Sequence, residues 1–207
     1  MLSEPKPEWL TVRPPGSGSY PELKHLFRAL NLHTVCEEAH CPNVGECWGG
    51  GTATLMLMGD TCSRGCRFCM VTPGRPSGVL DVMEPENVAF ALSQMGLTYV
   101  VLTSVDRDDL ADGGASHFAR TIQLVKEKVP GLLVEVLIPD FQGDLASLAL
   151  ITESKPDVIA HNIETTLSLT RTVRDPRANY WQSLSVLRNV KKLNPKIPTK
   201  SSIMVGL

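Results

Sequence analysis

The sequence predicts an α/β fold in which parallel strands and helices alternate to form a partial (β/α) barrel, preceded by an N-terminal extension. Two observations support this prediction. From Thr52 onward, short runs of apolar and β-branched residues alternate with segments of helical period. Before Thr52, residues 14–19 form a lead rich in proline, glycine and serine. We therefore expect an extension over residues 1–51 and a barrel over residues 52–207.

Each expected element follows from a local pattern. The extension has one short helical pattern, near Tyr20–Leu30, where apolar residues recur at helical spacing. Strands are expected at Thr52–Met58, Tyr99–Ser104, Leu132–Ile138, Asp157–His161 and Lys200–Val205. Helices are expected at Glu84–Met95, Ser116–Lys128, Asp144–Glu153 and Trp181–Leu193. Pro85 and Asp144 are start signals for two of these helices, and the Pro130-Gly131 pair is a stop signal for a third.

The sequence ends at Leu207, directly after the fifth expected strand, where a covering helix should follow. Parallel strands are normally buried on both faces. We therefore expect either that further residues complete the barrel or that the fold is an open, partial barrel.

The composition is that of a soluble globular protein, with 43% hydrophobic and 20% charged residues in 207. A formal net charge of −2 gives no electrostatic reason to expect nucleic acid or an anionic membrane as a partner. The N-terminus lacks the apolar core of a signal peptide, and no apolar run is long enough to cross a bilayer. These features predict a cytoplasmic protein that binds neither nucleic acid nor membrane.

All six cysteines lie in two triplets between Cys36 and Cys69. The first triplet is C-x4-C-x5-C and the second is C-x3-C-x2-C, and their members are Cys36, Cys41 and Cys47, then Cys62, Cys66 and Cys69. In a reducing compartment such triplets hold metal more often than they form disulfides. A structural zinc ion would need a remote fourth ligand, because no histidine lies in or just after the second triplet. That triplet follows the first expected strand closely, so it lies in a loop where barrel active sites are found.

A C-x3-C-x2-C motif in this position resembles the signature of the radical S-adenosylmethionine (SAM) superfamily. The resemblance implies a [4Fe-4S] cluster held by Cys62, Cys66 and Cys69, with one open iron that binds SAM. Reductive cleavage of SAM would give methionine and a 5′-deoxyadenosyl radical that abstracts hydrogen from C–H bonds.

The first triplet and its surroundings, Cys36 to Trp48, resemble the auxiliary-cluster motif of lipoyl synthases. Further stretches resemble the same family, at Pro7 to Leu10, Thr103 to Leu110, Asp112 to Ala115, His161 to Thr165, Thr199 to Ser201 and Met204 to Leu207. This resemblance implies a second [4Fe-4S] cluster, held by Cys36, Cys41 and Cys47 and consumed as the sulfur donor. The implied reaction inserts sulfur at carbons 6 and 8 of an octanoyl chain carried on a lysine of a lipoyl carrier domain.

The implied partners are an octanoylated carrier, either the glycine cleavage H protein or the lipoyl domain of a 2-oxoacid dehydrogenase, and an electron donor such as ferredoxin or flavodoxin. The family's fourth auxiliary ligand is a serine in a C-terminal Arg-Ser-Ser motif, which does not occur before Leu207. We therefore expect an incomplete version of the enzyme. The alternatives are another radical SAM sulfur-insertion enzyme, such as a biotin synthase, and a non-catalytic iron–sulfur or zinc module.

The resemblance also implies contacts with SAM. Asn162 and Glu164, expected two apart on a strand and therefore on one face, would bind the ribose hydroxyls. Arg174 would pair with the cofactor carboxylate, and Thr103 and Ser104 would lie near its amino group. The alternatives are that Glu164 caps the next helix, that Arg174 is a surface arginine paired with a neighbouring aspartate, and that the other residues only end their strands.

Overall fold

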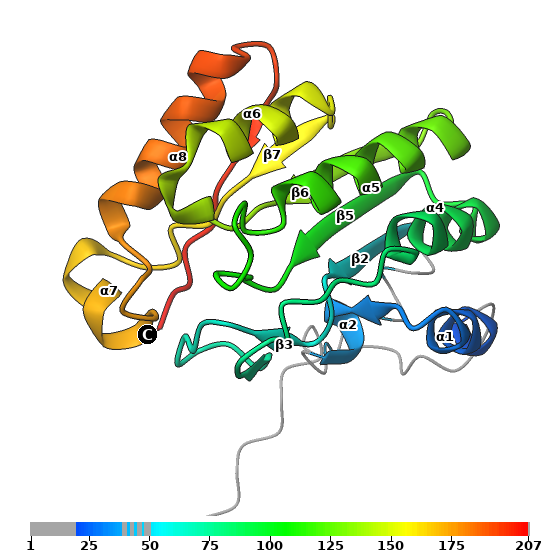
Figure 1. Ribbon diagram of the computed structural model, residues 1–207, viewed down its shortest axis with the longest axis horizontal. Helices are drawn as coiled ribbons and strands as arrows, with labels where there is room; N and C mark the ends of the chain where they lie inside the picture. The colour runs from blue at the N-terminus through cyan, green and yellow to red at the C-terminus, as the bar shows by residue number, and fades with distance from the viewer. Residues whose placement is uncertain (1–19, 39–40, 42–43, 45–46, 48–50, 207) are drawn as a thin grey trace, which may run out of the picture.

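The computed structural model describes residues 20–38, 41, 44, 47 and 51–206. Its centre is a six-stranded sheet in the order β1-β2-β5-β6-β7-β8 (Figure 1). The strands are β1 His33–Thr34, β2 Thr52–Leu57, β5 Tyr99–Ser104, β6 Leu133–Leu137, β7 Val158–Ala160 and β8 Thr199–Lys200. Neighbouring strands are parallel from β2 to β8, whereas β1 is antiparallel to β2. A separate parallel pair, β3 Thr61–Cys62 and β4 Thr72–Pro73, follows β2 in the chain.

Four helices lie side by side along one face of the sheet (Figure 1). They are α4 Glu84–Met95, α5 Ala115–Lys128, α6 Leu145–Glu153 and α8 Tyr180–Leu193. The remaining helices are α1 Tyr20–Ala29, α2 Val35–Glu38, α7 Leu167–Val173 and a short 3-10 turn at Phe141–Gly143. Because strands and helices alternate from β2 onward and those strands are parallel, the predicted α/β fold is confirmed. No helix in the described part of the chain is both long and apolar enough to span a membrane.

Most expected elements agree with the structure to within one residue at each end, and Glu84–Met95 and Tyr99–Ser104 agree at both ends. The expected strand Lys200–Val205 is wrong, because β8 spans only Thr199–Lys200. Its partner β7 ends at Ala160, so the ladder has no further rungs except an isolated bridge between Glu164 and Ile203. Six short elements of the described chain were not expected: β1, α2, β3, β4, the 3-10 turn and α7.

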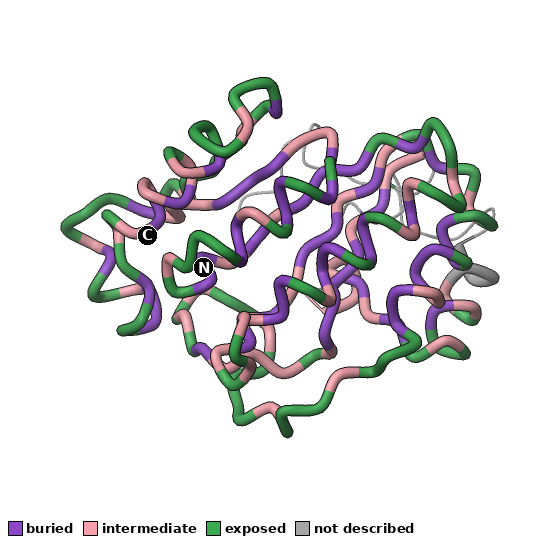
Figure 2. The backbone as a smooth tube through the Cα atoms, turned by 45° about the horizontal axis from the view of Figure 1, so that its top comes forward, coloured by how far each residue is buried: buried purple, intermediate pink, exposed green. Residues whose placement is uncertain are grey.

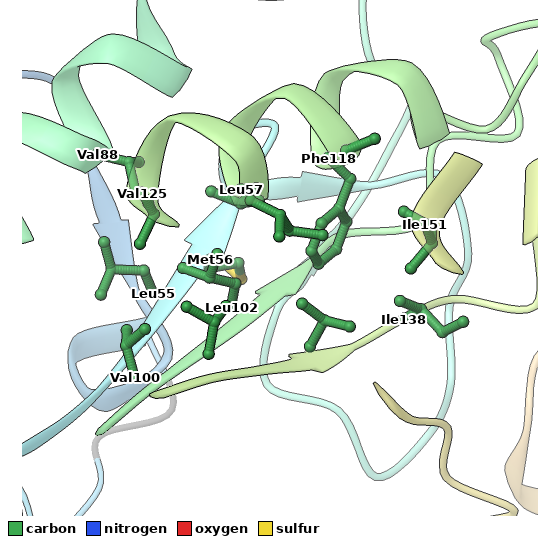
Figure 3. Close-up of a cluster of buried hydrophobic side chains, with 14 of the residues drawn as sticks. Leu55, Met56, Leu57, Val88, Val100, Leu102, Phe118, Val125, Ile138 and Ile151 are labelled. Atoms are coloured by element: carbon green, nitrogen blue, oxygen red, sulfur yellow. The ribbon is translucent and has the colours of Figure 1, made fainter. Parts of the chain in front are cut away.

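The hydrophobic core lies between the sheet and the four helices. Alternate strand residues point toward the helices, and these side chains are almost completely buried: Leu55, Leu57, Val100, Leu102, Val134 and Val136. They meet helix residues such as Phe118 and Val125 (Figure 3). The outer faces of the same helices are exposed to solvent (Figure 2). Strand residues on the opposite face, such as Val101 and Leu137, are only half buried, and that face carries the candidate site.

The N-terminal extension joins the main sheet. In β1, His33 is opposite Met56 and Thr34 is opposite Leu55, so β1 covers the free edge of β2. The expected boundary between residues 51 and 52 therefore falls between two strands that share hydrogen bonds, and the division into two domains stays a prediction. The lead at residues 14–19 lies outside the described residues.

Candidate functional site

A cavity of about 260 Å³ opens at the carboxyl ends of the parallel strands, on the sheet face away from the helices. Its wall includes Met56 of β2, Thr103 of β5, Leu137 of β6 and His161 just after β7. We call it the central cavity. The carboxyl ends of parallel strands are the usual place for a binding site in such folds, because the loops that follow the strands converge there.

All three cysteines of the second triplet line the central cavity. They belong to residues 62–69, which we call the cluster loop. The loop starts in β3, and its first turn is fixed by a hydrogen bond from Ser63 N–H to the carbonyl oxygen of Asp106, 2.9 Å long. Its last turn is closed by a bond from Cys69 N–H to the Cys66 carbonyl oxygen at 3.1 Å. The loop is thus a defined structure that presents its sulfur atoms to one cavity.

A buried arginine anchors the cluster loop to the sheet. Arg64 is 5% exposed, and its guanidinium donates to Asp108 and Asp140, which follow β5 and β6, over 2.8–2.9 Å. Burial alone would lower the pKa of Arg64, but the hydrogen bonds that it donates to these two carboxylates raise it. Asp140 also accepts from the Gln182 amide of α8 at 2.7 Å. Sequence reasoning gave these residues no role, although an arginine between two cysteines of the second triplet is visible in the sequence.

The sulfur atoms of the cluster loop accept backbone hydrogen bonds. Arg64 N–H and Asp106 N–H both lie 3.4 Å from Cys62 Sγ, and Asp175 N–H lies 3.3 Å from Cys66 Sγ. Burial raises the pKa of the Cys62 thiol to about 11 and also raises the pKa of Cys66, while these N–H groups act in the opposite direction. Both thiols are therefore protonated in the metal-free protein, and metal binding must release their protons.

The position of the second triplet is compatible with a cluster, because Cys62, Cys66 and Cys69 all border the central cavity. None of the six cysteines, all of which are described, takes part in a disulfide, so the disulfide alternative is not supported. Within the described residues, no group of three His, Cys, Asp or Glu side chains is arranged to hold a single metal ion. A four-iron cluster gives each thiolate its own iron, so its ligands do not need to converge on one point.

The five residues expected near SAM all border the central cavity. They are Thr103, Ser104, Asn162, Glu164 and Arg174. The expectation that Asn162 and Glu164 lie on a strand is wrong, because β7 ends at Ala160 and Glu164 has a left-handed backbone with φ 64°. The helix-cap alternative is also wrong, since Thr166 is the N-terminal cap residue of α7. Burial raises the pKa of Glu164, and a hydrogen bond with Asn162 opposes this shift.

Thr103 and Ser104 differ in their contacts. Thr103 donates its hydroxyl to the Leu137 carbonyl oxygen at 3.0 Å, which joins β5 to β6. Ser104 Oγ is buried and has no hydrogen-bond partner among the described residues. The Ser104 hydroxyl is therefore available to a ligand in the central cavity.

Arg174 is 9% exposed, and its Nη1 donates to Ser183 Oγ at 3.0 Å. The surface-arginine alternative is wrong, because Arg174 is buried and Asp175 pairs instead with Arg177. The Nε atom of Arg174 is buried without a partner in the described part of the chain. A buried N–H of this kind needs an acceptor.

His161 is a cavity residue that sequence reasoning quoted but did not assign. It is 4% exposed, and its Nδ1 donates to the Ile138 carbonyl oxygen at 2.8 Å, so Nδ1 carries the proton. Burial lowers the pKa of His161 below its usual value, which keeps the ring neutral. Nε2 is then a buried acceptor that has no donor among the described residues. The signal that could have revealed it is a polar residue directly after an apolar strand.

The first triplet lies beside a second, wider cavity of about 620 Å³, which we call the N-terminal cavity. Cys36 in α2 and Cys41 both line it, and Cys41 N–H donates to the Cys36 carbonyl oxygen at 3.1 Å. Cys47 is exposed and is not among the residues that border this cavity. Val35, next to Cys36, lines the central cavity. The helix α2 therefore lies between the two cavities.

Two family models match the chain. Residues 56–207 match the radical SAM superfamily, and residues 3–41 match the N-terminal domain of lipoyl synthase. Among solved structures, methylornithine synthase has a similar fold, with a TM-score of 0.58 and 19% identity, covering 92% of this chain and 53% of that one.

Curated relatives agree with these matches. Lipoyl synthase of Anaeromyxobacter dehalogenans is 56% identical over 98% of this chain and 68% of its own length. The Thermus thermophilus enzyme is also 56% identical, over 98% of this chain and 62% of its own length. The mitochondrial lipoyl synthase of Arthroderma otae is 59% identical over 97% of this chain and 50% of its own length. The chain thus spans about half to two thirds of these relatives, and it belongs to the radical SAM superfamily and, within it, to the lipoyl synthase family.

Proposed function

We propose that this protein is a sulfurtransferase of the lipoyl synthase type. It inserts two sulfur atoms, at carbons 6 and 8, into an octanoyl chain attached to a lysine of a lipoyl carrier domain. The observation that supports this most directly is the central cavity, where Cys62, Cys66 and Cys69 share one space with buried polar atoms that have no partner among the described residues.

The donors in the central cavity suit the cofactors of the superfamily. When bound, a [4Fe-4S] cluster and SAM supply the 5′-deoxyadenosyl radical that removes hydrogen from the substrate. The protein contributes ligands, orientation and exclusion of water. Arg174 Nε can donate to the SAM carboxylate, and Asn162 with Glu164 can bind the ribose hydroxyls. Ser104 Oγ and His161 Nε2 offer a further donor and acceptor at the same wall.

The remaining wall of the central cavity suits an acyl chain. Val35, Met56, Val71, Leu137 and Ile138 border the cavity with apolar side chains. An octanoyl chain has no polar group beyond its amide, so its burial against such a wall is favoured by the hydrophobic effect. The reacting carbons would then lie close to the radical source in an environment with little water.

A second [4Fe-4S] cluster, held by Cys36, Cys41 and Cys47, is proposed as the sulfur donor. Two of these cysteines line the N-terminal cavity, and Val35, the residue before Cys36, lines the central cavity. This proximity supports transfer of sulfur between the two sites. The carrier protein, glycine cleavage H protein or a 2-oxoacid dehydrogenase lipoyl domain, and an electron donor of the ferredoxin or flavodoxin type are proposed as partners.

Single cysteine variants test this division of labour. After anaerobic reconstitution, the Cys62→Ala variant should lose SAM cleavage, measured as 5′-deoxyadenosine. The Cys36→Ala variant should retain SAM cleavage but form no thiolated product on an octanoylated carrier. If the wild-type protein binds zinc but assembles no iron–sulfur cluster and yields no 5′-deoxyadenosine, a non-catalytic metal module is supported instead. Loss of SAM cleavage in both variants would contradict separate roles for the two triplets.

A further inference from the structure

The cluster loop is held on a second side by residues 173–177, which connect α7 to α8 and which we call the strap. Arg67 N–H of the loop donates to the Val173 carbonyl oxygen at 2.8 Å. In the other direction, Arg177 Nη2 of the strap donates to the Ser63 carbonyl oxygen at 2.6 Å. The strap is remote from the loop in sequence but adjacent to it in space (Figure 1). It therefore fixes both ends of the segment that carries Cys66.

Asp175 is the central residue of the strap. It is 6% exposed, and its carboxylate accepts from Gly65 N–H at 2.9 Å. The same carboxylate pairs with Arg177, whose Nε lies 2.8 Å from Oδ1. The backbone N–H of Asp175 donates to Cys66 Sγ at 3.3 Å. One buried residue thus contacts both the backbone bend of the loop and one of its ligand sulfur atoms.

We propose that Asp175 is a positioning residue for the iron–sulfur cluster that Cys62, Cys66 and Cys69 bind. Its carboxylate fixes the bend at Gly65, and the resulting position of its backbone N–H polarises the sulfur of Cys66. This inference rests on the proposed function, because it requires that cluster.

Two physical effects follow from this geometry. Hydrogen bonds to ligand sulfur atoms help to set the reduction potential of a cluster. An N–H dipole directed at sulfur stabilises the negative charge that reduction adds, so its displacement makes the potential more negative, whereas removal of the nearby carboxylate charge makes the potential more positive. Groups that hold a metal ligand in place also contribute to metal affinity, and their removal typically costs about 10–100-fold in affinity or activity. Asp175 should therefore influence both the potential of the cluster and its retention.

The chain offers a matched control in Asp157. Its carboxylate also pairs with a cation, Lys126 Nζ at 2.8 Å, and also accepts a backbone N–H from another element, Val134 at 2.8 Å. Asp157 lies just before β7, at the opposite end of that strand from the central cavity. A purely structural role predicts similar behaviour for Asp157 and Asp175, whereas the proposed role predicts a difference at the metal site.

The test compares Asp175→Ala, Asp175→Asn and Asp157→Asn with the wild type, each as the full chain reconstituted anaerobically with iron and sulfide. A redox titration followed by electron paramagnetic resonance should show a more negative potential for Asp175→Ala than for Asp175→Asn, because both variants lose the carboxylate charge but only alanine also removes the acceptor for Gly65 N–H. Iron release to a chelator should be about tenfold faster for Asp175→Ala. Asp157→Asn should match the wild type in both measurements, even if its unfolding midpoint falls.

The outcomes separate this inference from the proposed function. A wild type that assembles no [4Fe-4S] cluster contradicts the proposed function itself. A wild type with a cluster, but with the same potential and the same iron release in Asp175→Ala as in Asp175→Asn, overturns the role of Asp175 alone. If Asp175→Ala does not fold, iron release from Asp175→Asn decides. It should be faster than from Asp157→Asn, because the lost ion pair with Arg177 holds the side chain against the cluster loop, and equal rates overturn the role of Asp175.

Discussion

Glu84 anchors the end of β2, from which the chain enters the cluster loop, and its removal is the most informative stability test. Glu84 is 5% exposed, and its two oxygens lie 2.9 and 3.0 Å from the Met58 nitrogen. His117 Nε2 lies 2.6 Å from the same carboxylate. Met58 has a left-handed backbone with φ 69°, which a residue with a side chain rarely adopts. The hydrogen bond from Met58 N–H to the Glu84 carboxylate helps to hold this unfavourable conformation.

The size of the effect can be worked out from these contacts. A hydrogen bond to a charged group contributes about 1.5–3 kcal/mol, and a buried donor left without a partner costs about 1–3 kcal/mol. Because the two contacts share one carboxylate and are not additive, we expect Glu84→Ala to lower the free energy of unfolding by about 3 kcal/mol. For a chain of this size, that corresponds to a fall of roughly 6–12 °C in Tm.

Urea unfolding of the metal-free, reduced chain, followed by circular dichroism, measures this loss. Glu86→Ala is the matched control, because Glu86 lies in the same first turn of α4 and its partner Arg120 is 59% exposed in its side chain. Both variants lose the same interaction with the helix dipole, so their difference isolates the buried contacts. Glu84→Gln should lie between the wild type and Glu84→Ala. Equal losses in Glu84→Ala and Glu86→Ala would refute the reasoning.

Three further predictions concern the core and the central cavity. Phe118→Ala should lower the free energy of unfolding by about 3–5 kcal/mol, because Phe118 is fully buried, whereas Phe90→Ala should change it little, because Phe90 is 49% exposed; urea midpoints compare the two. Because burial lowers the pKa of His161, its neutral form favours folding above the ordinary pKa near 6.5, and this contribution is lost as the pH falls through the lower value of the folded state. His161→Gln should therefore flatten the decline in stability on acidification from pH 7, and an unchanged slope would contradict this. Glu164→Gln should weaken SAM binding about 10–150-fold, the equivalent of one charged hydrogen bond of about 1.5–3 kcal/mol, while the exposed Glu153→Gln leaves it unchanged; calorimetry on the reconstituted chain checks this.

The elements that sequence reasoning located well are those whose signals are local. The strand Tyr99–Ser104 is a continuous run of β-branched and apolar residues, and the helix Glu84–Met95 has proline at its start and Gly96 in a left-handed conformation at its end. β1 was missed because two residues carry no periodic pattern, and they form a strand only because β2 offers a free edge. The extent of β8 was overestimated because hydrophobicity at Ile203 and Val205 does not reveal that both residues are exposed.

The candidate site shows the same limit. Spacing alone indicated that Cys62, Cys66 and Cys69 share one loop, because ligands within one loop need only local geometry. The contacts that hold this loop come from Asp140 and Asp175, which are remote in sequence. No periodicity or motif identifies such partners, because each aspartate reaches the loop only through the fold of the whole chain.

The pairing of β1 with β2 affects how the two cysteine triplets tolerate mutation. Thr34 faces Leu55 across the ladder, and Cys36 follows Thr34 by two residues, while the cluster loop begins shortly after β2. Main-chain groups make these bonds, so many side chains can be exchanged at the half-buried His33 without altering the separation of the triplets, whereas Thr34 is buried and its hydroxyl accepts from Glu37 N–H. Proline is the exception, because it lacks the N–H that a rung requires. Changes at the more exposed side of this strand can therefore accumulate while the spacing between the two cysteine-bearing segments stays the same.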